Sequence, residues 1–387
     1  FHSDAVKFKY NHKTEVNRME LQLKDIELAA ERLKLILHHT ELDMSSTFSA
    51  MTGGEIYLKC ENRQKTGSFK IRGASNKIAA LVERGDVKSV VASSAGNHAQ
   101  GVAYAAHKFG IPATIVMPAS APIAKVQATE GYGAKVVLHG DCYDDAYAMA
   151  CKVCETEGAT FLHPYNDLEV IAGQGTLGLE ILGNLPTADV VIVPAGGGGL
   201  LAGVAACLKQ INPRIKVIGV QAEGADAIAQ SFREKKYIST DSVSTIADGI
   251  AVKAPGDITV KLIATPVAAV LKGKVDVKGK KVVCLLSGGN IDVSFIQCII
   301  AQGLVARNRR LKFTATLLDK PGSLVKLLNA IAAQGANILT VEHDRLSAGL
   351  TPNQTNVHIA CEVGGKEHGE RLLRALGDKG FKISLNY

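Results

Sequence analysis

The chain has 387 residues, of which 47% are hydrophobic and 21% charged. That length favours two or three domains, and the composition is that of an ordinary globular protein. The net charge of +7 is spread thinly. Its densest cluster, residues 307–312, has no interleaved aromatic residue, so a solvated linker is favoured over a nucleic-acid patch. No apolar run reaches the ~18 residues that a membrane span needs, so no membrane partner is expected.

Short apolar strands and helices alternate through most of the chain. The first helix is amphipathic and covers residues 25–37. Strands are predicted at 55–59, 89–93, 113–117, 135–138, 190–194, 216–221 and 281–286, and further helices at 69–83, 99–109, 143–157 and 200–210. Strands of this kind belong to parallel sheets covered by helices. The number of strand–helix units is too large for one small sheet, and two doubly wound open-sheet domains with a cleft between them are therefore predicted.

The pattern changes after Arg310. Strands are predicted at 311–318, 336–344, 356–363 and 381–385, with helices at 324–334 and 367–376. This βαββαβ order is typical of a ferredoxin-like module. The domain boundary is placed at residues 302–310.

The eight cysteines show no paired spacing suited to a disulfide framework, and a reducing cytoplasm is expected. Cys151 and Cys154 form a CxxC within a predicted helix, but no second CxxC or HxxxH accompanies them. Two thiols one helical turn apart are the favoured interpretation, and no metal site is predicted.

Four segments stand out for their chemistry, each a modest signal when taken alone, and the first two lie at the starts of predicted helices. Lys70 follows a Gly-Ser turn in residues 65–73 and starts a helix. The positive helix end and a cleft would both lower its pKa, as a Schiff-base nucleophile requires. A surface lysine is the alternative for any isolated Lys. Residues 195–200, Ala-Gly-Gly-Gly-Gly-Leu, lie between a strand and a helix, where backbone N–H groups converge on an anion.

Two further segments lie at ends of predicted strands. Residues 93–100 contain Ser-Ala-Gly-Asn-His, whose main-chain N–H groups could hold a carboxylate, although His98 alone would more often be a packed histidine. Residues 287–290, Ser-Gly-Gly-Asn, follow a buried strand at the edge where ligands collect in open α/β sheets.

In this order, the segments resemble the threonine dehydratases (threonine ammonia-lyases), a fold-type-II family of pyridoxal-phosphate enzymes, over about residues 25 to 300. The matching positions are Glu61-Asn62, residues 67–70, Arg72-Gly73, 94–98, 173–176, 196–199, 247–249 and 287–290. The resemblance implies a large cofactor-binding domain from residues 1–64 and 165–305. It implies a small catalytic domain at 65–164 and a C-terminal domain at 310–387.

The resemblance also implies roles for single residues. Lys70 would carry pyridoxal 5'-phosphate as a Schiff base and then act as the catalytic base that removes the Cα proton of L-threonine or L-serine. The other implied cofactor-binding residues are Phe69, Asn97, Gly196, Gly197, Gly198, Gly199, Leu200, Gly249 and Ser287. The implied substrate-binding residues are Ser94, Ala95, Gly96, Asn97 and His98. The products would be 2-oxobutanoate and ammonia.

The C-terminal module resembles an ACT domain at residues 319–324 and 335–338. Such modules usually pair across subunits and bind an amino acid, so a homo-oligomer, dimer or tetramer, and an amino-acid effector are expected. The candidate regulatory residues are Gly322, Ser323, Leu324, Asn337 and Ile338. A role in assembly alone is the alternative.

One stretch departs from the family. Residues 261–263 run directly into 264–268, where family members carry a longer segment with a helix and a Glu-Gly-Ala-Gly-like turn near the cofactor. Either this chain has a true deletion, which would remove a wall of the cofactor pocket, or a segment is left out of the sequence.

Several other functions compete with deamination as interpretations of this sequence. Within the family they are serine racemase and the β-replacing synthases; a racemase carries a serine where this chain has Ala95. A nicotinamide-dependent dehydrogenase could use the glycine-rich turn, with Glu223 holding a ribose. A regulatory sensor with a decayed catalytic half is disfavoured, because Lys70, Asn97 and Ser287 are all present.

Overall fold

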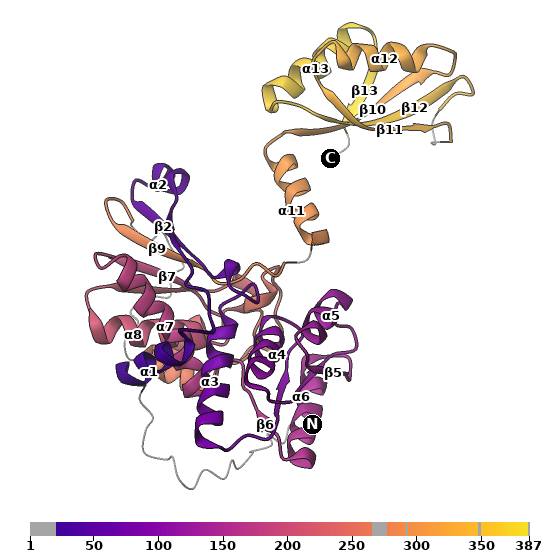
Figure 1. The fold of residues 1–387 in the computed structure, drawn as a ribbon. Helices are drawn as coiled ribbons and strands as arrows, with labels where there is room; N and C mark the ends of the chain where they lie inside the picture. Colours follow the sequence, from indigo (N-terminus) through magenta and orange to yellow (C-terminus); the bar gives the residue numbers. More distant parts are fainter. Residues whose placement is uncertain (1–20, 265–276, 292, 347–349, 386–387) are drawn as a thin grey trace. The chain divides into compact units, whose positions relative to one another are not determined.

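The computed structural model describes residues 21–264, 277–291, 293–346 and 350–385. Contacts divide the chain into two compact units, residues 1–290 and 291–387, which are treated separately below (Figure 1). No helix in the described ranges is long and apolar enough to cross a membrane.

The first unit contains two sheets, both mainly parallel. One has the order β1-β2-β9-β7-β8, in which only β1 runs antiparallel to its neighbour. Its strands are β1 Leu42–Met44, β2 Glu55–Cys60, β7 Val190–Pro194, β8 Lys216–Val220 and β9 Lys281–Leu286. The other has the order β5-β4-β3-β6 and is wholly parallel. Its strands are β3 Val90–Ser93, β4 Ala113–Met117, β5 Lys135–Leu138 and β6 Thr160–Phe161.

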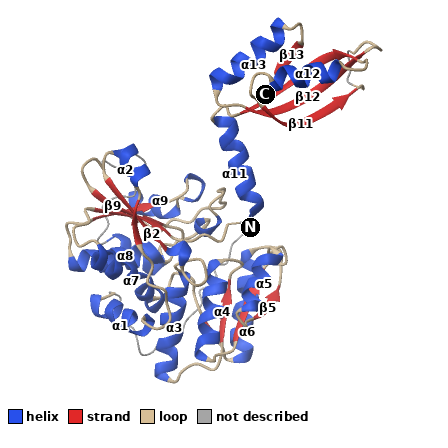
Figure 2. Cartoon of the chain, turned by 45° about the horizontal axis from the view of Figure 1, so that its top comes forward, coloured by secondary structure: helices blue, strands red, loops and turns tan. Residues whose placement is uncertain are grey.

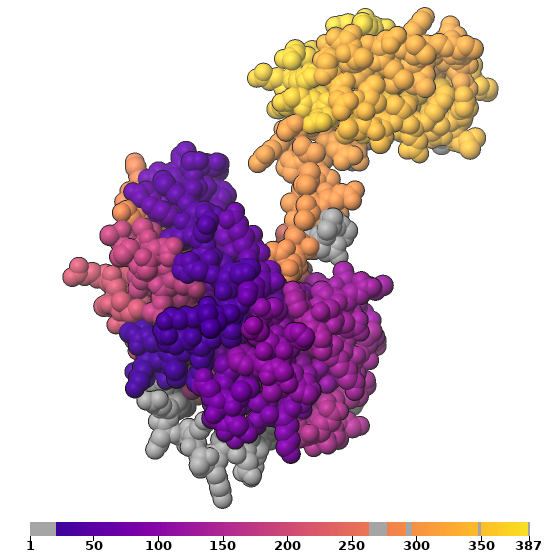
Figure 3. All heavy atoms as spheres, in the orientation of Figure 1, coloured from indigo at the N-terminus to yellow at the C-terminus, as the bar shows by residue number. Residues whose placement is uncertain are grey.

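Helices cover both sheets, as the apolar sequences of the strands require. The helices of this part of the chain are α1 Leu23–Leu33, α2 Ser46–Thr52, α3 Lys70–Arg84, α4 Asn97–Phe109, α5 Ile123–Gly131, α6 Tyr143–Glu157, α7 Leu168–Asn184, α8 Gly199–Ile211, α9 Ala227–Glu234 and α10 Asp257–Ala264. Helices α7 and α8 pack on each other beside the five-stranded sheet, and α3 contacts both α7 and α4 (Figure 2). Helix α3 therefore connects the two sheet regions, which form one continuous surface in Figure 3.

Separate hydrophobic cores support the two sheets. One lies between the five-stranded sheet and helices α1, α7 and α8, and includes Ile171, Val191 and Leu201. Another lies between β3, β4, α3 and α4, and includes Ile78, Val102 and Ile115. The predicted open-sheet class is thus observed. The sequence patterns missed β1, α2, β6, α9 and α10, which have only two to eight residues each. They also missed the 17-residue helix α7, because it is buried on most sides and its apolar residues show no one-sided spacing.

The second unit has an antiparallel sheet with the order β11-β12-β10-β13 and two helices on one face. Its elements are α11 Val293–Ala306, β10 Arg310–Leu318, α12 Ser323–Ala332, β11 Asn337–Asp344, β12 Gln354–Glu362, α13 Lys366–Asp378 and β13 Lys382–Leu385. The apolar residues of α12 and α13 pack on β10 and β12 around Phe313 and Ile359. One expectation needs correction: residues 307–312 are not all linker, because β10 begins at Arg310.

Candidate active site

Lys70 is the first residue of α3, and its amine faces a loop that follows β6. Its Nζ donates to the main-chain oxygen of Pro164 at 2.8 Å. The amine also lies 5.3 Å from the ring centroid of Phe69 and 6.0 Å from that of Tyr165. Burial among these groups lowers the pKa of Lys70 to about 8. The amine is therefore a far better nucleophile and base near neutral pH than an exposed lysine would be.

The segment that ends β9 lies directly against the start of α3. The N–H of Phe69 donates to the main-chain oxygen of Ser287 at 3.0 Å, and Ser68 forms an isolated bridge with Gly288. Hydrogen bonds therefore join parts of the chain that are more than 200 residues apart, and Ser287 lies against Phe69, the residue before Lys70.

Asn97, the first residue of α4, lies next to the segment that follows β9. The Nδ2 of Asn290 donates to its Oδ1 at 2.9 Å. A Cβ added to Gly288 would lie 3.2 Å from the Asn97 Nδ2, and one added to Gly249 would lie 3.8 Å from it. Asn290 also fills the space beside Gly67, where φ is +69° and a Cβ would lie 2.3 Å from the Asn290 Oδ1. Only glycine can occupy that position without displacing Asn290.

His98 is buried behind this group and has one fixed partner. Its Nε2 lies 2.9 Å from the main-chain oxygen of Leu162, so that nitrogen carries the proton. Its Nδ1 has no partner among the described residues. Burial, and then the charge of Lys70, lower the pKa of His98 to about 3. The ring is therefore neutral at physiological pH. In the same segment, the Gly96 N–H donates to the Ser94 Oγ at 3.2 Å, while Ala95 is half-buried.

The glycine-rich turn connects β7 to α8. Gly198 has a φ of +98°, and a Cβ there would lie 2.7 Å from the Oγ1 of Thr259. Over the parts of the chain that the structure describes, the main-chain N–H groups of residues 196–200 donate no hydrogen bond to another main-chain group. N–H groups without a main-chain acceptor at a helix N-terminus attract a phosphate or other anion.

Tyr165 joins the lysine to this turn. A Cβ added to Gly197 would lie 2.4 Å from the Tyr165 ring, and one added to Gly199 would lie 2.9 Å from its Cβ. The Tyr165 hydroxyl donates to the main-chain oxygen of Ala254 at 3.1 Å. The sequence patterns missed the loop from His163 to Asn166 altogether. Its place at the carboxyl end of a parallel strand could have indicated it, but the strand before it has only two residues.

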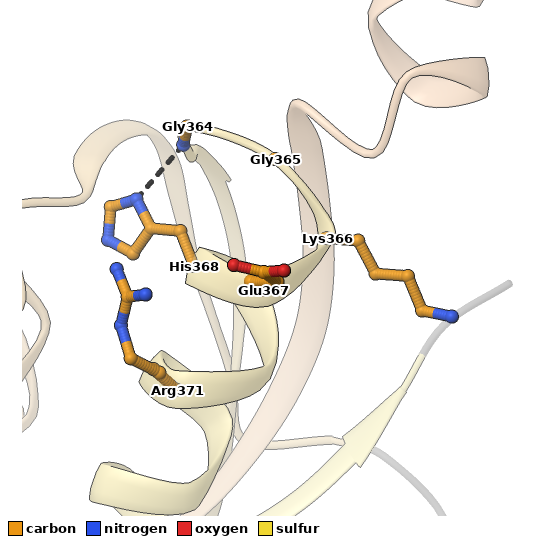
Figure 4. A pocket seen from close by; sticks show the side chains of 6 residues that line it. All are labelled: Gly364, Gly365, Lys366, Glu367, His368 and Arg371. Atoms are coloured by element: carbon orange, nitrogen blue, oxygen red, sulfur yellow. Dashed lines mark hydrogen bonds between the residues drawn. The ribbon is translucent and has the colours of Figure 1, made fainter.

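The regulatory candidates lie in the second unit. Gly322 precedes α12 with a φ of +85°, Ser323 and Leu324 begin that helix, and Asn337 and Ile338 begin the edge strand β11. A separate hollow of about 500 Å³ lies at the start of α13 (Figure 4). Its His368 is already engaged, because the Nδ1 accepts from the Gly364 N–H and the Nε2 contacts the Gln334 oxygen.

Helix α10 ends at Ala264, and residues 265–276 lie outside the described residues. The expectation that a pocket wall is missing concerns that stretch.

The functional groups around Lys70 suit those of pyridoxal phosphate, which has an aldehyde and a phosphate. A partly desolvated amine can bond to an aldehyde, and the unsatisfied N–H groups of the glycine turn suit a phosphate. Across the described ranges, no group of three or more His, Cys, Asp or Glu residues could hold a metal ion.

Comparison with known proteins agrees with this chemistry. A family model described as pyridoxal-phosphate dependent enzyme matches residues 33–276. The L-threonine ammonia-lyase of Thermotoga maritima is 46% identical over an alignment that covers 94% of this chain and 99% of that protein. The alignment spans 399 positions, more than the 387 residues of this chain, so some positions of that relative have no counterpart here.

Two solved structures have the same fold as the first unit. Maize serine racemase superposes with a TM-score of 0.68 and 34% identity, over 74% of this chain and 98% of that one. The processed form of threonine deaminase isoform 2 from Solanum lycopersicum gives a TM-score of 0.69 and 31% identity, over 73% of this chain and 87% of that one.

Proposed function

Because this chain belongs to the family of pyridoxal-phosphate dependent enzymes, we propose that it deaminates L-threonine to 2-oxobutanoate and ammonia and also accepts L-serine. The observation that carries the proposal is the Lys70 amine, with a pKa of about 8, beside Ser287 and across Tyr165 from the glycine turn. The 46% identity to an L-threonine ammonia-lyase over nearly the whole chain supports threonine as the substrate.

Several groups would hold the cofactor. The N–H groups of residues 196–200 would bind its phosphate, Phe69 would pack beside its ring, and Asn97 with Gly249 would border the same space. Ser287 would meet the ring nitrogen. Bound there, pyridoxal phosphate withdraws electrons from the Cα of an amino acid joined to it, which makes the Cα proton acidic.

The chain's own residues would then manage the substrate and its protons. The main-chain N–H groups of residues 94–98 bind the substrate carboxylate and orient the Cα–H bond toward Lys70. The unprotonated Lys70 amine takes the Cα proton. The β-hydroxyl leaves as water once it has gained a proton, and hydrolysis of the released enamine gives the 2-oxo acid and ammonia. His98 is neutral and therefore adds no charge beside the amine.

Serine racemisation is the alternative within the family, and the similarity to maize serine racemase makes it specific. The distinguishing position is Ala95, whose methyl group can neither donate nor accept a proton on the opposite face of the substrate. We therefore expect L-serine to give pyruvate and ammonia without D-serine. D-serine formed at a rate comparable to ammonia would refute this assignment.

The substitution K70A tests the Schiff-base role. It should abolish both the cofactor's absorbance near roughly 412 nm, which arises from the conjugated Schiff base, and the release of 2-oxobutanoate. Lys65→Ala is a matched control, because Lys65 lies five residues earlier and its Nζ is 5.8 Å from the Tyr104 ring instead. Normal turnover by K70A would show that the lysine is not the catalytic group, and would reopen a nicotinamide-dependent reaction at the glycine turn.

The second unit has the element order and sheet order of a ferredoxin-like module, which supports an ACT-like amino-acid sensor. In this proposal an amino acid binds near Gly322, Ser323, Leu324, Asn337 and Ile338, and two copies of the unit pair in a homo-oligomer. The exposed edge strand β11 supports such pairing, because a free strand edge accepts a further strand. Binding of a branched-chain amino acid, measured by calorimetry on the full chain, is the direct test.

A further inference from the structure

We infer that His163 is a positioning residue for the Lys70 amine, acting through the main-chain oxygen of Pro164. His163 lies in the loop after β6, and within the described residues its side chain forms hydrogen bonds to that loop and not to the glycine turn or the Ser287 segment. The inference rests on the proposed function in one respect only, namely that Lys70 is the base.

The geometry of the loop carries the inference. The Nδ1 of His163 accepts from the Asn166 N–H at 2.8 Å and from the Tyr165 N–H at 3.3 Å. Two acceptor contacts at Nδ1 require the ring proton to lie on Nε2. The side chain thereby closes a turn around Pro164, and the carbonyl of that residue points at the Lys70 Nζ, 2.8 Å away.

A second anchor holds the other end of the turn. The Asn166 Nδ2 donates to the Asp257 Oδ1 at 2.6 Å, and its Oδ1 accepts from the Ile258 N–H at 3.0 Å. Asn166 thus fixes the turn to the start of α10, while His163 fixes the turn internally. The His163 contacts reach the main-chain N–H groups of the two residues that follow the Pro164 carbonyl.

A carbonyl oxygen at this distance matters most after Lys70 has taken up a proton. A hydrogen bond to the charged form of a group stabilises that form and raises its pKa. The Pro164 oxygen would therefore receive the lysine ammonium between removal of the Cα proton and its later release. The hydrogen bond would offset part of the fall in the Lys70 pKa that burial causes, and so keep the amine basic enough to accept the proton.

No full charge competes with this effect in the described surroundings of the amine. The titratable groups that face it are His98 on α4 and His163 and Tyr165 in the loop. Burial lowers the pKa of His163 to about 4 and raises that of Tyr165 to about 12, so both are neutral at physiological pH. The amine's hydrogen-bond partner in the described residues is the Pro164 carbonyl oxygen.

The test uses His163→Leu, which keeps the volume apolar and removes the acceptor, and His163→Asn, whose side-chain oxygen can replace Nδ1. The first readout needs no activity. The cofactor-free full chain is labelled with acetic anhydride over a range of pH, and mass spectrometry follows the peptide that bears Lys70. The half-buried amine should titrate about one pH unit lower in His163→Leu than in the parent chain, and His163→Asn should restore it.

The second readout is the pH dependence of threonine deamination by the cofactor-loaded enzyme. In His163→Leu the acid limb of kcat should move to lower pH by the same amount, with kcat reduced roughly tenfold because the amine is less basic and less well placed. The KM for threonine should change little, since His163 does not belong to the carboxylate segment.

The outcomes are distinguishable. An unchanged Lys70 titration in His163→Leu, with a native circular dichroism spectrum, would overturn the positioning role even if threonine is deaminated. If His163→Leu lowers the pH at which Lys70 titrates but the parent chain does not deaminate threonine, the positioning role stands and the proposed function is refuted. If His163→Leu is unfolded, the failure of His163→Asn to titrate like the parent chain would also count against the inference.

Discussion

Replacing Arg72 by leucine should strongly destabilise the first unit, because Arg72 lies at the centre of a buried ionic network. The side chain is fully buried on α3, two residues after Lys70. Its Nε and Nη2 each donate to the Glu61 carboxylate at 2.8 Å, and its Nη1 donates to Glu180 at 2.6 Å. Lys59, also fully buried, donates to Glu180 at 2.7 Å.

The magnitude follows from what the substitution leaves behind. Glu61 is fully buried, and without Arg72 its carboxylate keeps, among the side chains that the structure describes, only the Thr40 hydroxyl at 2.6 Å. Removing one partner of a buried ion pair in this way costs about 3–5 kcal/mol. The matched control is Arg63→Leu, whose exposed pair with Asp43 at 3.0 Å should contribute less than about 1 kcal/mol.

Urea unfolding followed by circular dichroism measures both variants. Burial alone would raise the pKa of Glu180, but Arg72 and Lys59 outweigh it and lower that pKa. A carboxyl group with a lowered pKa contributes stability above its unfolded value, about 4.3, which is lost as the pH falls through the lowered value. The difference between Arg72→Leu and the parent should therefore shrink in acid. A loss at neutral pH no larger than that of Arg63→Leu would refute the reasoning.

Three further predictions follow from the site and the second unit. Gly197→Ala should weaken binding of pyridoxal phosphate at least about tenfold in a fluorescence titration, since the new methyl group would lie 2.4 Å from the Tyr165 ring; unchanged affinity would exclude close approach there. The rate of threonine deamination should rise with pH and level off above about pH 8, because the base must be unprotonated and its pKa is about 8. A rate that stays constant between about pH 6 and 9 would contradict the role of Lys70 as the base. A chain ending at Arg309 should still deaminate threonine but lose its response to an amino-acid effector, a coupling typically worth about 1–3 kcal/mol. Its mass in solution should also fall if the second unit pairs subunits. A full effector response in the shortened chain would place the sensor elsewhere.

Much of the first unit could be predicted because its candidate functional residues adjoin regular elements in the sequence. Lys70, Asn97, the glycine turn and Ser287 each follow or begin a regular element, and the strand–helix alternation places such residues at one sheet edge. What the sequence could not show is contact across long separations. The Pro164 carbonyl carries no side-chain signal at all, and Tyr165 matters through its position over glycines 32 to 34 residues later. Asn290 could be matched to a family pattern, but its contact with Asn97 appears only in the fold.

The second unit illustrates a different limit. Its strands were predicted within a residue or two, because alternation of apolar residues sets them directly. Helix α11 was not predicted, since its apolar residues show no clear one-sided spacing, and the same stretch suggested a boundary.

The order of strands in the large sheet has a consequence for synthesis of the protein. Strand β9 is the last of its sheet to leave the ribosome, yet it lies between β2 and β7 at the centre. Until residue 286 has emerged, β2 and β7 each present an unpaired edge, and Lys70 lacks the Ser287 segment that borders it. The nascent chain can complete its second sheet early, because β3 to β6 are contiguous in sequence, but the catalytic site can form only after nearly three quarters of the chain exists. Such a chain depends on protection of its open sheet edges during translation.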